Sequence, residues 1–311
     1  MSKIAFIFSG QGAQKIGMGK ELYDNFDCAK KVFDEASDAL GFDICDMIFN
    51  GDEANLQITE NTQPCILTMS VAAAEVLMQK GVNPDVVAGL SLGEYSAHVC
   101  SGTFRFSDAV RLVKKRGRYM QEEVAEGVGA MAAIIGIPES DVYDCCRIAS
   151  EVGICEPANL NCPGQIVVSG EKEAVEKCCE VAKKKGAKRA MLLAVSAPFH
   201  CKMLTGAGLK LSNELKATEI FDMNIPLISN VNADYIKKED VRDILTRQVS
   251  SSVLWQKSVE KMIEDGIDTF IEVGPGKALS GFVKKISSDV RIFNVEDINS
   301  LNTCLEGLGI C

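Results

Sequence analysis

Short apolar runs alternate with amphipathic stretches along most of this 311-residue chain. The amphipathic stretches predict helices, such as one over 64–80 that ends before Gly81 and one over 107–124 that opens at Ser107 with Asp108 in its first turn. The apolar runs predict strands at residues 4–8, 86–88, 227–229, 269–273 and 292–295. Such alternation is typical of an α/β fold, so we expect a largely parallel sheet that is doubly wound or closely related to that architecture.

A central stretch interrupts this rhythm. Its predicted elements are, in order, strand 130–137, helix 140–151, strands 155–161 and 166–169, helix 172–185 and strand 187–194. The βαββαβ order is that of the ferredoxin-like split unit. We therefore expect a core of residues 1–127 and 195–311 and an inserted unit of residues 128–194, with hinges near Gly127 and just before Ser196. The crevice between the two units is the expected binding site.

Charge and composition exclude several classes of protein. The 33 basic and 43 acidic side chains give a net charge of −10, which argues against binding nucleic acid through a positive surface. The first apolar run is too short for a signal peptide, and uncharged stretches such as 61–74 are too short to span a membrane. The 13 cysteines include no CxxC pair, so we expect no metal site and a protein of the reduced cytoplasm.

Residues 89–93 have the GxSxG pattern, with Ser91 at its centre, and stand between the predicted strand 86–88 and a helix-forming stretch at 92–99. A serine on a strand-to-helix turn projects its hydroxyl above the sheet, and the N-terminus of the following helix can stabilise an oxyanion. The pattern therefore predicts a nucleophile. The alternative is a glycine-rich turn in which Ser91 only caps the helix.

A serine nucleophile needs a base, and the chain has two histidines, His98 and His200. His98 follows Ser91 by seven residues, which is about 10 Å along a helix axis and too far for a hydrogen bond, so we expect it to pack within the helix. His200 follows an apolar strand, on a loop toward the crevice. By elimination we assign His200 as the partner of Ser91, the alternative being a structural loop histidine. No acidic residue has the spacing of a triad member.

Helical periodicity places Arg116 on the apolar face of helix 107–124, whereas the other basic residues of this helix lie on its solvated face: Arg111, Lys114, Lys115 and Arg118. Burying an unpaired guanidinium is costly, so Arg116 needs an anionic partner. Its planar fork fits a carboxylate. The sequence leaves open whether that carboxylate belongs to an internal Asp or Glu or to a ligand.

Two glycine-containing loops depart from nucleotide-binding motifs. The loop at 10–15 has Lys15 where GxGxxG needs its third glycine, and the loop at 274–279 has Leu279 there. Neither loop supports a nucleotide cofactor. The first loop should lie beside the Ser91 turn, where a backbone N–H of Gln11 or Gly12 could donate to an oxyanion.

Several linked motifs extend over practically the whole chain. They are residues 8–14 (FSGQGAQ), 89–96 (GLSLGEYS), 116–121 (RGRYMQ), Asn159 with 161–165 (NCPGQ), 197–200 (APFH), 247–248 (RQ) and 272–276 (EVGPG). In order and spacing these motifs resemble those of the malonyl-CoA:acyl carrier protein transacylases. A set of linked motifs is far more specific than GxSxG alone.

The resemblance implies an α/β hydrolase-like core with an inserted ferredoxin-like subdomain, and a transferase of type II fatty acid synthesis. Malonyl would pass from malonyl-CoA, a substrate, to the phosphopantetheine thiol of acyl carrier protein, without a cofactor, through a malonyl ester on Ser91 with His200 as base. The alternative is a stand-alone acyltransferase that loads polyketide carrier proteins; an esterase or a non-catalytic carrier-binding module fits the residues less well. We expect a cytoplasmic monomer with no nucleic-acid or membrane partner.

The resemblance also implies roles for the remaining motif residues. The backbone N–H groups of Gln11 and Leu92 would stabilise the oxyanion. Arg116 would pair with the malonyl carboxylate, and the main-chain carbonyl of Gln248 would orient the histidine. The residues that would line the substrate pocket are Phe199, Asn159 and Asn161. The chain departs from the family pattern at three positions, namely Ser9 in place of the usual proline, Leu90 in place of a common histidine, and His98 in place of an apolar residue.

Overall fold

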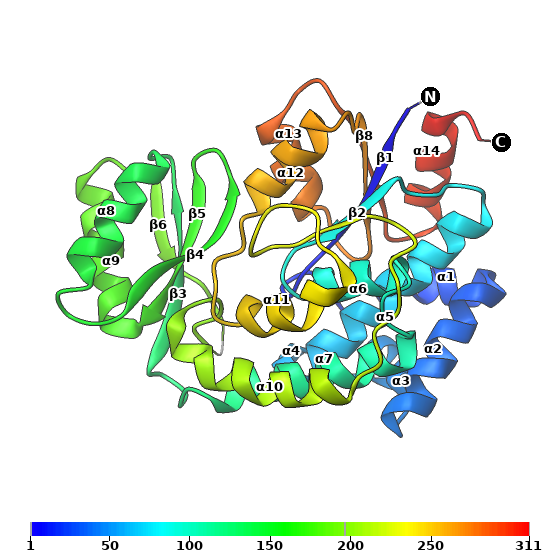
Figure 1. Ribbon diagram of the computed structural model, residues 1–311, viewed down its shortest axis with the longest axis horizontal. Coiled ribbons are helices and arrows are strands. Elements are labelled where there is room, and N and C mark those ends of the chain that lie inside the picture. The colour runs from blue at the N-terminus through cyan, green and yellow to red at the C-terminus, as the bar shows by residue number, and fades with distance from the viewer. Residues whose placement is uncertain (1, 196, 311) are drawn as a thin grey trace.

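Five parallel strands lie side by side in the main sheet of the computed structural model, which describes residues 2–195 and 197–310 (Figure 1). Their order across the sheet is β7-β2-β1-β8-β9. The strands are β1 (Ile4–Phe8), β2 (Val86–Gly89), β7 (Leu227–Ile228), β8 (Thr269–Val273) and β9 (Arg291–Val295). Each strand begins and ends within one residue of its predicted limits, and the prediction of a parallel sheet is confirmed.

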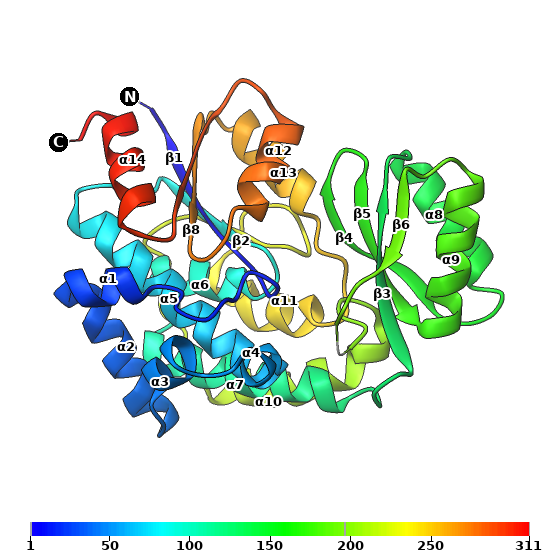
Figure 2. The same cartoon turned by 180° about the vertical axis from the view of Figure 1, so that it is seen from behind.

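Helices pack on both faces of this sheet (Figures 1 and 2). They are α1 (Lys20–Asn25), α2 (Asp27–Leu40), α3 (Ile44–Phe49), α4 (Glu53–Gln57), α5 (Thr59–Gln79), α6 (Gly93–Cys100), α7 (Phe106–Glu122), α10 (Thr205–Ala217), α11 (Val241–Gln248), α12 (Trp255–Glu264), α13 (Ala278–Ile286) and α14 (Ile298–Leu308), with short 3₁₀ turns η1 (Lys202–Leu204) and η2 (Lys238–Asp240). Along β1, Ala5 and Ile7 pack with α12 and α13, whereas Phe6 and Phe8 belong to the core that includes α2, α5 and α7. Burial on both faces explains why the strands read as continuous apolar runs.

Two helices begin earlier than the sequence predicts. The start of α5 is Thr59 rather than Pro64, so one turn of helix precedes the proline. The start of α7 is Phe106, because the backbone changes from extended to helical at Arg105, and no side chain caps this helix. The prediction that Ser107 opens the helix is therefore wrong. Among the helices of the described part, none is long and apolar enough to cross a membrane.

The inserted unit is an antiparallel sheet with two helices on one side (Figures 1 and 2). Its strand order is β4-β5-β3-β6. The elements are β3 (Gly129–Ile135), α8 (Glu139–Ala149), β4 (Cys155–Cys162), β5 (Gln165–Glu171), α9 (Lys172–Lys184) and β6 (Arg189–Leu192), and their buried side chains form a separate apolar cluster. The predicted βαββαβ order is confirmed. Its limits of 128–194 stay a proposal, and Ser196, at the second predicted hinge, lies outside the described residues.

Two glycines allow the close packing of the turn after β2, Gly89 against the start of α6 and Gly93 against the end of β1. A Cβ on Gly89 would lie 2.0 Å from the carbonyl oxygen of Gly93, and a Cβ on Gly93 would lie 2.1 Å from the carbonyl oxygen of Phe8. These distances are far below van der Waals contact, and the atoms concerned are backbone atoms that cannot rotate away. The glycines of the GxSxG pattern are therefore required for packing.

We expect Gly93→Ala to lower the free energy of unfolding by about 3 kcal/mol or more, because the added methyl group must displace a strand. Gly281→Ala is the matched control, since a Cβ at this exposed position of α13 meets no atom within 4 Å. The control should be neutral or stabilising by up to about 1 kcal/mol. Urea unfolding of both variants measures the difference. Equal stabilities would contradict the close packing of the turn.

Candidate active site

Ser91 lies on the turn between β2 and α6, and its φ of 55° places it in the left-handed region, which residues other than glycine rarely adopt. Its Oγ lies 2.6 Å from Nε2 of His200. The N-cap position of α6 is occupied by Leu92, and no side chain caps that helix, so Ser91 is not a helix cap. The structure brings together the two residues that the sequence paired.

His200 is buried and also has a left-handed backbone, with a φ of 62°. Its Nδ1 lies 2.9 Å from the main-chain carbonyl oxygen of Gln248. A carbonyl oxygen only accepts hydrogen bonds, so Nδ1 carries the proton and Nε2 can accept one from the Ser91 hydroxyl. Burial, followed by the positive charge of Arg116, lowers the pKa of His200 to about 4. The ring is therefore neutral near pH 7, which is the state that a general base requires.

Arg116 extends from α7 toward this pair and is 1% exposed. Its guanidinium donates to Oε1 of Gln63 at 2.9 Å and to Oε1 of Gln248 at 3.0 Å. It also donates to Oγ of Ser91 at 3.1 Å. All these acceptors are neutral, and within residues 2–195 and 197–310 no acidic side chain forms an ion pair with Arg116. Of the two partners that the sequence left open, the internal one acts only at a distance, because buried Glu94 attracts Arg116 without forming an ion pair with it. A ligand carboxylate fits direct contact with the guanidinium.

Three side chains that the sequence analysis missed surround these groups: Gln63, Glu94 and Asn230. The Ser91 N–H donates to Oδ1 of Asn230 at 2.6 Å, and the Ser91 carbonyl accepts from Nε2 of Gln248 at 3.0 Å. Glu94 Oε2 accepts from that same Nε2 at 2.6 Å and from the Asn230 N–H at 3.1 Å. The sequence does set one of them apart, because Glu94 is the only Asp, Glu, Lys or Arg between positions 85 and 105.

The loop after β1 lies beside the Ser91 turn, as predicted. The N–H of Leu90 donates to the carbonyl of Phe8 at 3.0 Å, and a Cβ on Gly10 would lie 2.5 Å from the Leu90 carbonyl oxygen. Gln11 follows directly, with its side chain donating to Thr59 Oγ1 at 3.3 Å. Leu92, at the N-cap of α6, has an N–H outside the helical hydrogen-bond ladder. Both backbone groups stay candidates for oxyanion donors.

The other predicted pocket residues lie in two places, Phe199 beside the base and the two asparagines in the inserted unit. Phe199 precedes the base and is 8% exposed, packed in the large core. Asn159 and Asn161 lie on β4 and are mostly buried, and neither side chain hydrogen-bonds to Ser91 or Arg116 in the part of the chain that is described. The Asn161 Oδ1 is buried and has no hydrogen-bond partner among the described residues. Their contact with substrate stays a prediction.

His98 is fully buried in α6, and neither of its ring nitrogens has a hydrogen-bond partner among the described residues. Its ring packs against that of Phe104, with centroids 5.2 Å apart. Burial lowers the pKa of His98 to about 3. It is a packed helix residue, as the sequence analysis expected, and it is not part of the Ser91 contacts.

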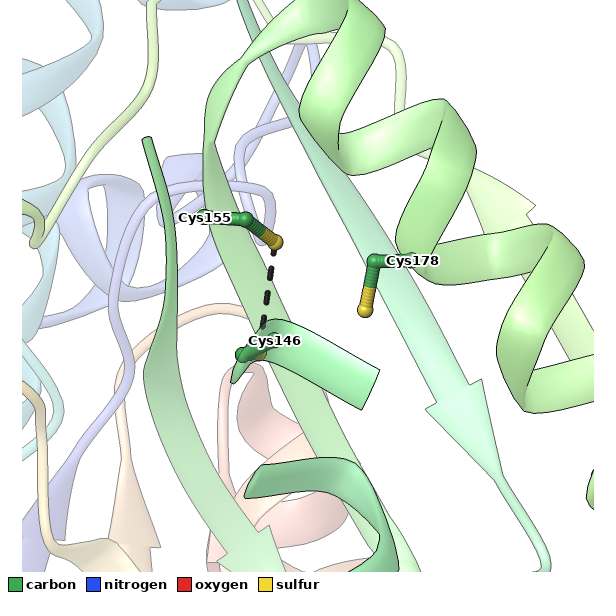
Figure 3. A group of neighbouring side chains, drawn as sticks. All are labelled: Cys146, Cys155 and Cys178. Carbon is green, nitrogen blue, oxygen red and sulfur yellow. Dashed lines mark hydrogen bonds between the residues drawn. The ribbon is translucent and has the colours of Figure 1, made fainter. Parts of the chain in front are cut away.

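The described residues contain one group with the spacing to hold a metal ion. Figure 3 shows Cys146, Cys155 and Cys178 converging from α8, β4 and α9, with sulfurs within 4.8 Å of one another. All three belong to the apolar cluster of the inserted unit. Hydrogen bonds among the three thiols act in opposite directions, since they raise the pKa of Cys146 and lower that of Cys155 to about 5, whereas a metal site needs every ligating thiol as a thiolate. We assign these thiols to core packing, and none of them hydrogen-bonds to Ser91, His200 or Arg116.

Comparison with known proteins identifies the class to which this fold and Ser–His pair belong. The family model described as an acyl transferase domain matches residues 5–300, and the chain therefore belongs to the acyl transferase family.

Within that family, the chain is similar to malonyl transacylases. The chain is 46% identical to the malonyl CoA-acyl carrier protein transacylase of Bacillus subtilis strain 168, over 99% of this chain and 98% of the relative. The crystal structure of the enzyme of that name from Clostridium perfringens has a TM-score of 0.97 and 50% identity, over 99% of this chain and 98% of that one. A type II PKS acyl-carrier protein in complex with its malonyl-transacylase matches with a TM-score of 0.96 and 42% identity, over 98% of this chain and 100% of that one. The resemblance stated from the motifs is confirmed.

We expect the neutral, buried ring of His98 to make stability depend on pH. The unfolded chain binds a proton at this residue below about pH 6.5 but the folded chain does not, so wild-type protein loses stability as the pH falls through that value. Relative to His98→Leu, the wild-type free energy of unfolding should drop by about 2 kcal/mol between pH 7 and pH 5. Urea unfolding at both pH values measures this. A constant difference between the two proteins would contradict a buried neutral ring.

Proposed function

We propose that the protein is an acyltransferase that moves malonyl from malonyl-CoA to the phosphopantetheine thiol of acyl carrier protein. The observation that carries this proposal is the arrangement of three residues: a Ser91–His200 pair at 2.6 Å and the buried, unpaired charge of Arg116 at 3.1 Å from the serine oxygen. The names of the relatives support it, since those enzymes are malonyl CoA-acyl carrier protein transacylases.

The first half-reaction forms a malonyl ester on Ser91. His200 Nε2 takes the hydroxyl proton as Oγ attacks the thioester carbonyl, and the backbone N–H groups of Gln11 and Leu92 receive the negative charge that develops on the carbonyl oxygen. The carbon–sulfur bond then breaks, and the sulfur of coenzyme A leaves with the proton from His200. The main-chain carbonyl of Gln248 keeps the imidazole ring in place throughout.

The second half-reaction reverses these steps on another thiol. The phosphopantetheine thiol gives its proton to His200 and attacks the malonyl ester, and the proton returns to Ser91 Oγ when the ester bond breaks. The thioester consumed and the thioester formed are of similar energy, so the transfer needs no cofactor. We further propose that the enzyme is a cytoplasmic monomer without a nucleic-acid or membrane partner.

A second candidate function uses the same chemistry with another carrier. The protein could load polyketide carrier proteins, and the observation that favours this is its similarity to a malonyl-transacylase in complex with a type II PKS acyl-carrier protein. Malonyl transfer rates to a fatty acid carrier and to a polyketide carrier, measured side by side, distinguish the two. We expect the fatty acid carrier to be the better acceptor.

We expect wild-type protein incubated with malonyl-CoA to gain the mass of one malonyl group, and Ser91→Ala to gain none. Intact-protein mass spectrometry measures the adduct. Cys201→Ser is the control, because Cys201 is a buried thiol next to the base and its loss should leave the adduct in place. An adduct on Ser91→Ala, or one discharged by water as fast as by the carrier thiol, would contradict a serine transferase.

We expect Arg116→Ala to slow acylation by malonyl-CoA about 100-fold or more relative to acylation by acetyl-CoA, because only malonyl carries the carboxylate that the buried guanidinium needs. Arg118→Ala is the matched control, since Arg118 lies on the exposed face of the same helix. The two acylation rates, followed by mass spectrometry, give the preference. A malonyl preference that survives the loss of Arg116 would refute its role as the carboxylate partner.

A further inference from the structure

Glu94 is a buried carboxylate for which the transfer reaction has no use. It is 0% exposed, and Oε1 has no hydrogen-bond partner among the described residues. No lysine or arginine of the described chain forms an ion pair with it. Burial raises the pKa of Glu94 to about 7, and its hydrogen bonds to Gln248 and Asn230 and the charge of Arg116 act in the opposite direction. Burying a carboxyl group costs free energy, which hydrogen bonds to its oxygens only partly offset. Its two hydrogen bonds both lead to residues that hold the active site.

The first hydrogen bond fixes the side chain of Gln248. A carboxylate only accepts, so Glu94 requires that the Gln248 amide turn Nε2 toward it, at 2.6 Å. Oε1 then faces Arg116, where it accepts from the guanidinium at 3.0 Å. With the amide reversed, Nε2 would face the guanidinium, and two donors would oppose each other. Glu94 and the Ser91 carbonyl, which accepts from the same Nε2 at 3.0 Å, together determine which group Gln248 offers to Arg116.

The second hydrogen bond fixes the turn that carries the nucleophile. Glu94 accepts from the N–H of Asn230 at 3.1 Å, and the Asn230 side chain binds the Ser91 N–H and the Gly89 carbonyl, each at 2.6 Å. Gln248 Nε2 binds the Ser91 carbonyl at 3.0 Å. Both peptide groups of the left-handed Ser91 are thus held by residues that Glu94 holds, as a strained backbone requires.

We propose that Glu94 is a positioning residue that directs the Arg116 guanidinium toward the malonyl carboxylate, by fixing the amide of Gln248, and that holds the Ser91 turn through Asn230. This role rests on the proposed malonyl transfer. It places a carboxylate behind the active site without contact to His200, whose Nδ1 is bound by a carbonyl oxygen. The acid therefore acts on substrate selection and on the nucleophile turn, and not on the base as a triad acid does.

The test compares Glu94→Gln with wild type in acylation by malonyl-CoA and by acetyl-CoA, followed by intact-protein mass. A neutral amide of the same shape can turn its own NH₂ group toward Gln248, so the shortest hydrogen bond that holds the Gln248 amide is weakened, and the ratio of the malonyl rate to the acetyl rate should fall about tenfold or more. A variant that is merely less stable would slow both reactions equally. An unchanged ratio in folded Glu94→Gln would overturn the proposal.

Glu272→Gln is the matched control. Glu272 is also 0% exposed and also accepts two hydrogen bonds, from the backbone N–H groups of Leu279 and Ser280 at the start of α13. Its substitution should lower stability and leave the malonyl-to-acetyl ratio unchanged. A similar fall of the ratio in this variant would show that loss of any buried acid is enough, and would overturn the specific role of Glu94.

Gln248→Met keeps the proposal testable if Glu94→Gln does not fold. It removes the side-chain amide but keeps the main-chain carbonyl that binds His200, so it too should lose malonyl preference about tenfold or more. In this background, Glu94→Gln should cause little further change in the ratio, because the two residues act through one hydrogen bond. Unchanged preference in Gln248→Met would refute the route through Gln248. A wild-type protein that forms no malonyl adduct would instead refute the proposed function.

Discussion

The backbone conformation of Ser91 is the constraint on which the active site depends. A left-handed φ at a serine is unfavourable on its own, and it persists here because the surroundings fix it from several sides. Gly89 lets the start of α6 pack against β2, Gly93 lets the turn approach β1, and Asn230 and Gln248 bind the two peptide groups of the serine. The result is a hydroxyl that points above the sheet edge toward His200. Loosening any of these contacts would move the nucleophile away from its base.

A second constraint is the charge of Arg116 in a buried site. Its described hydrogen-bond acceptors are neutral, and Glu94 attracts it only from behind Gln248, so the guanidinium has no direct ion pair until a ligand brings a carboxylate. The same charge helps to lower the pKa of His200. A malonyl carboxylate bound to Arg116 would offset this effect, so that His200 becomes a stronger base when the correct substrate is present. Selectivity and activation would then come from one ion pair, which an acetyl group cannot form.

Much of the fold could be predicted from local pattern. The strands of the main sheet and the βαββαβ unit follow directly from apolar runs and periodicity, because burial on both faces leaves a clear signal in sequence. The helix starts at Thr59 and Phe106 were missed, since backbone geometry rather than a capping side chain determines them. Helix limits depend on such local detail.

The candidate site was predictable only in part. Ser91, His200 and Arg116 were found because a motif, a scarcity of histidine and a periodicity each pointed to one residue. Asn230 and Gln63 carry no such signal, because an uncharged amide far away in sequence shows its role only when the fold brings it to the turn. Glu94 was conspicuous as an isolated acid, but its function depends on hydrogen bonds that spacing does not reveal.

The central claim is that malonyl is held by a covalent bond to Ser91 and an ion pair to Arg116 at the same time. A crystal structure of the protein after reaction with malonyl-CoA, in the absence of a carrier, tests this most directly. We expect an ester on Ser91 Oγ whose free carboxylate lies within hydrogen-bond distance of the Arg116 guanidinium, in place of the present contact between Arg116 and the serine oxygen. An acyl group on another residue, or a carboxylate that faces solvent, would contradict it.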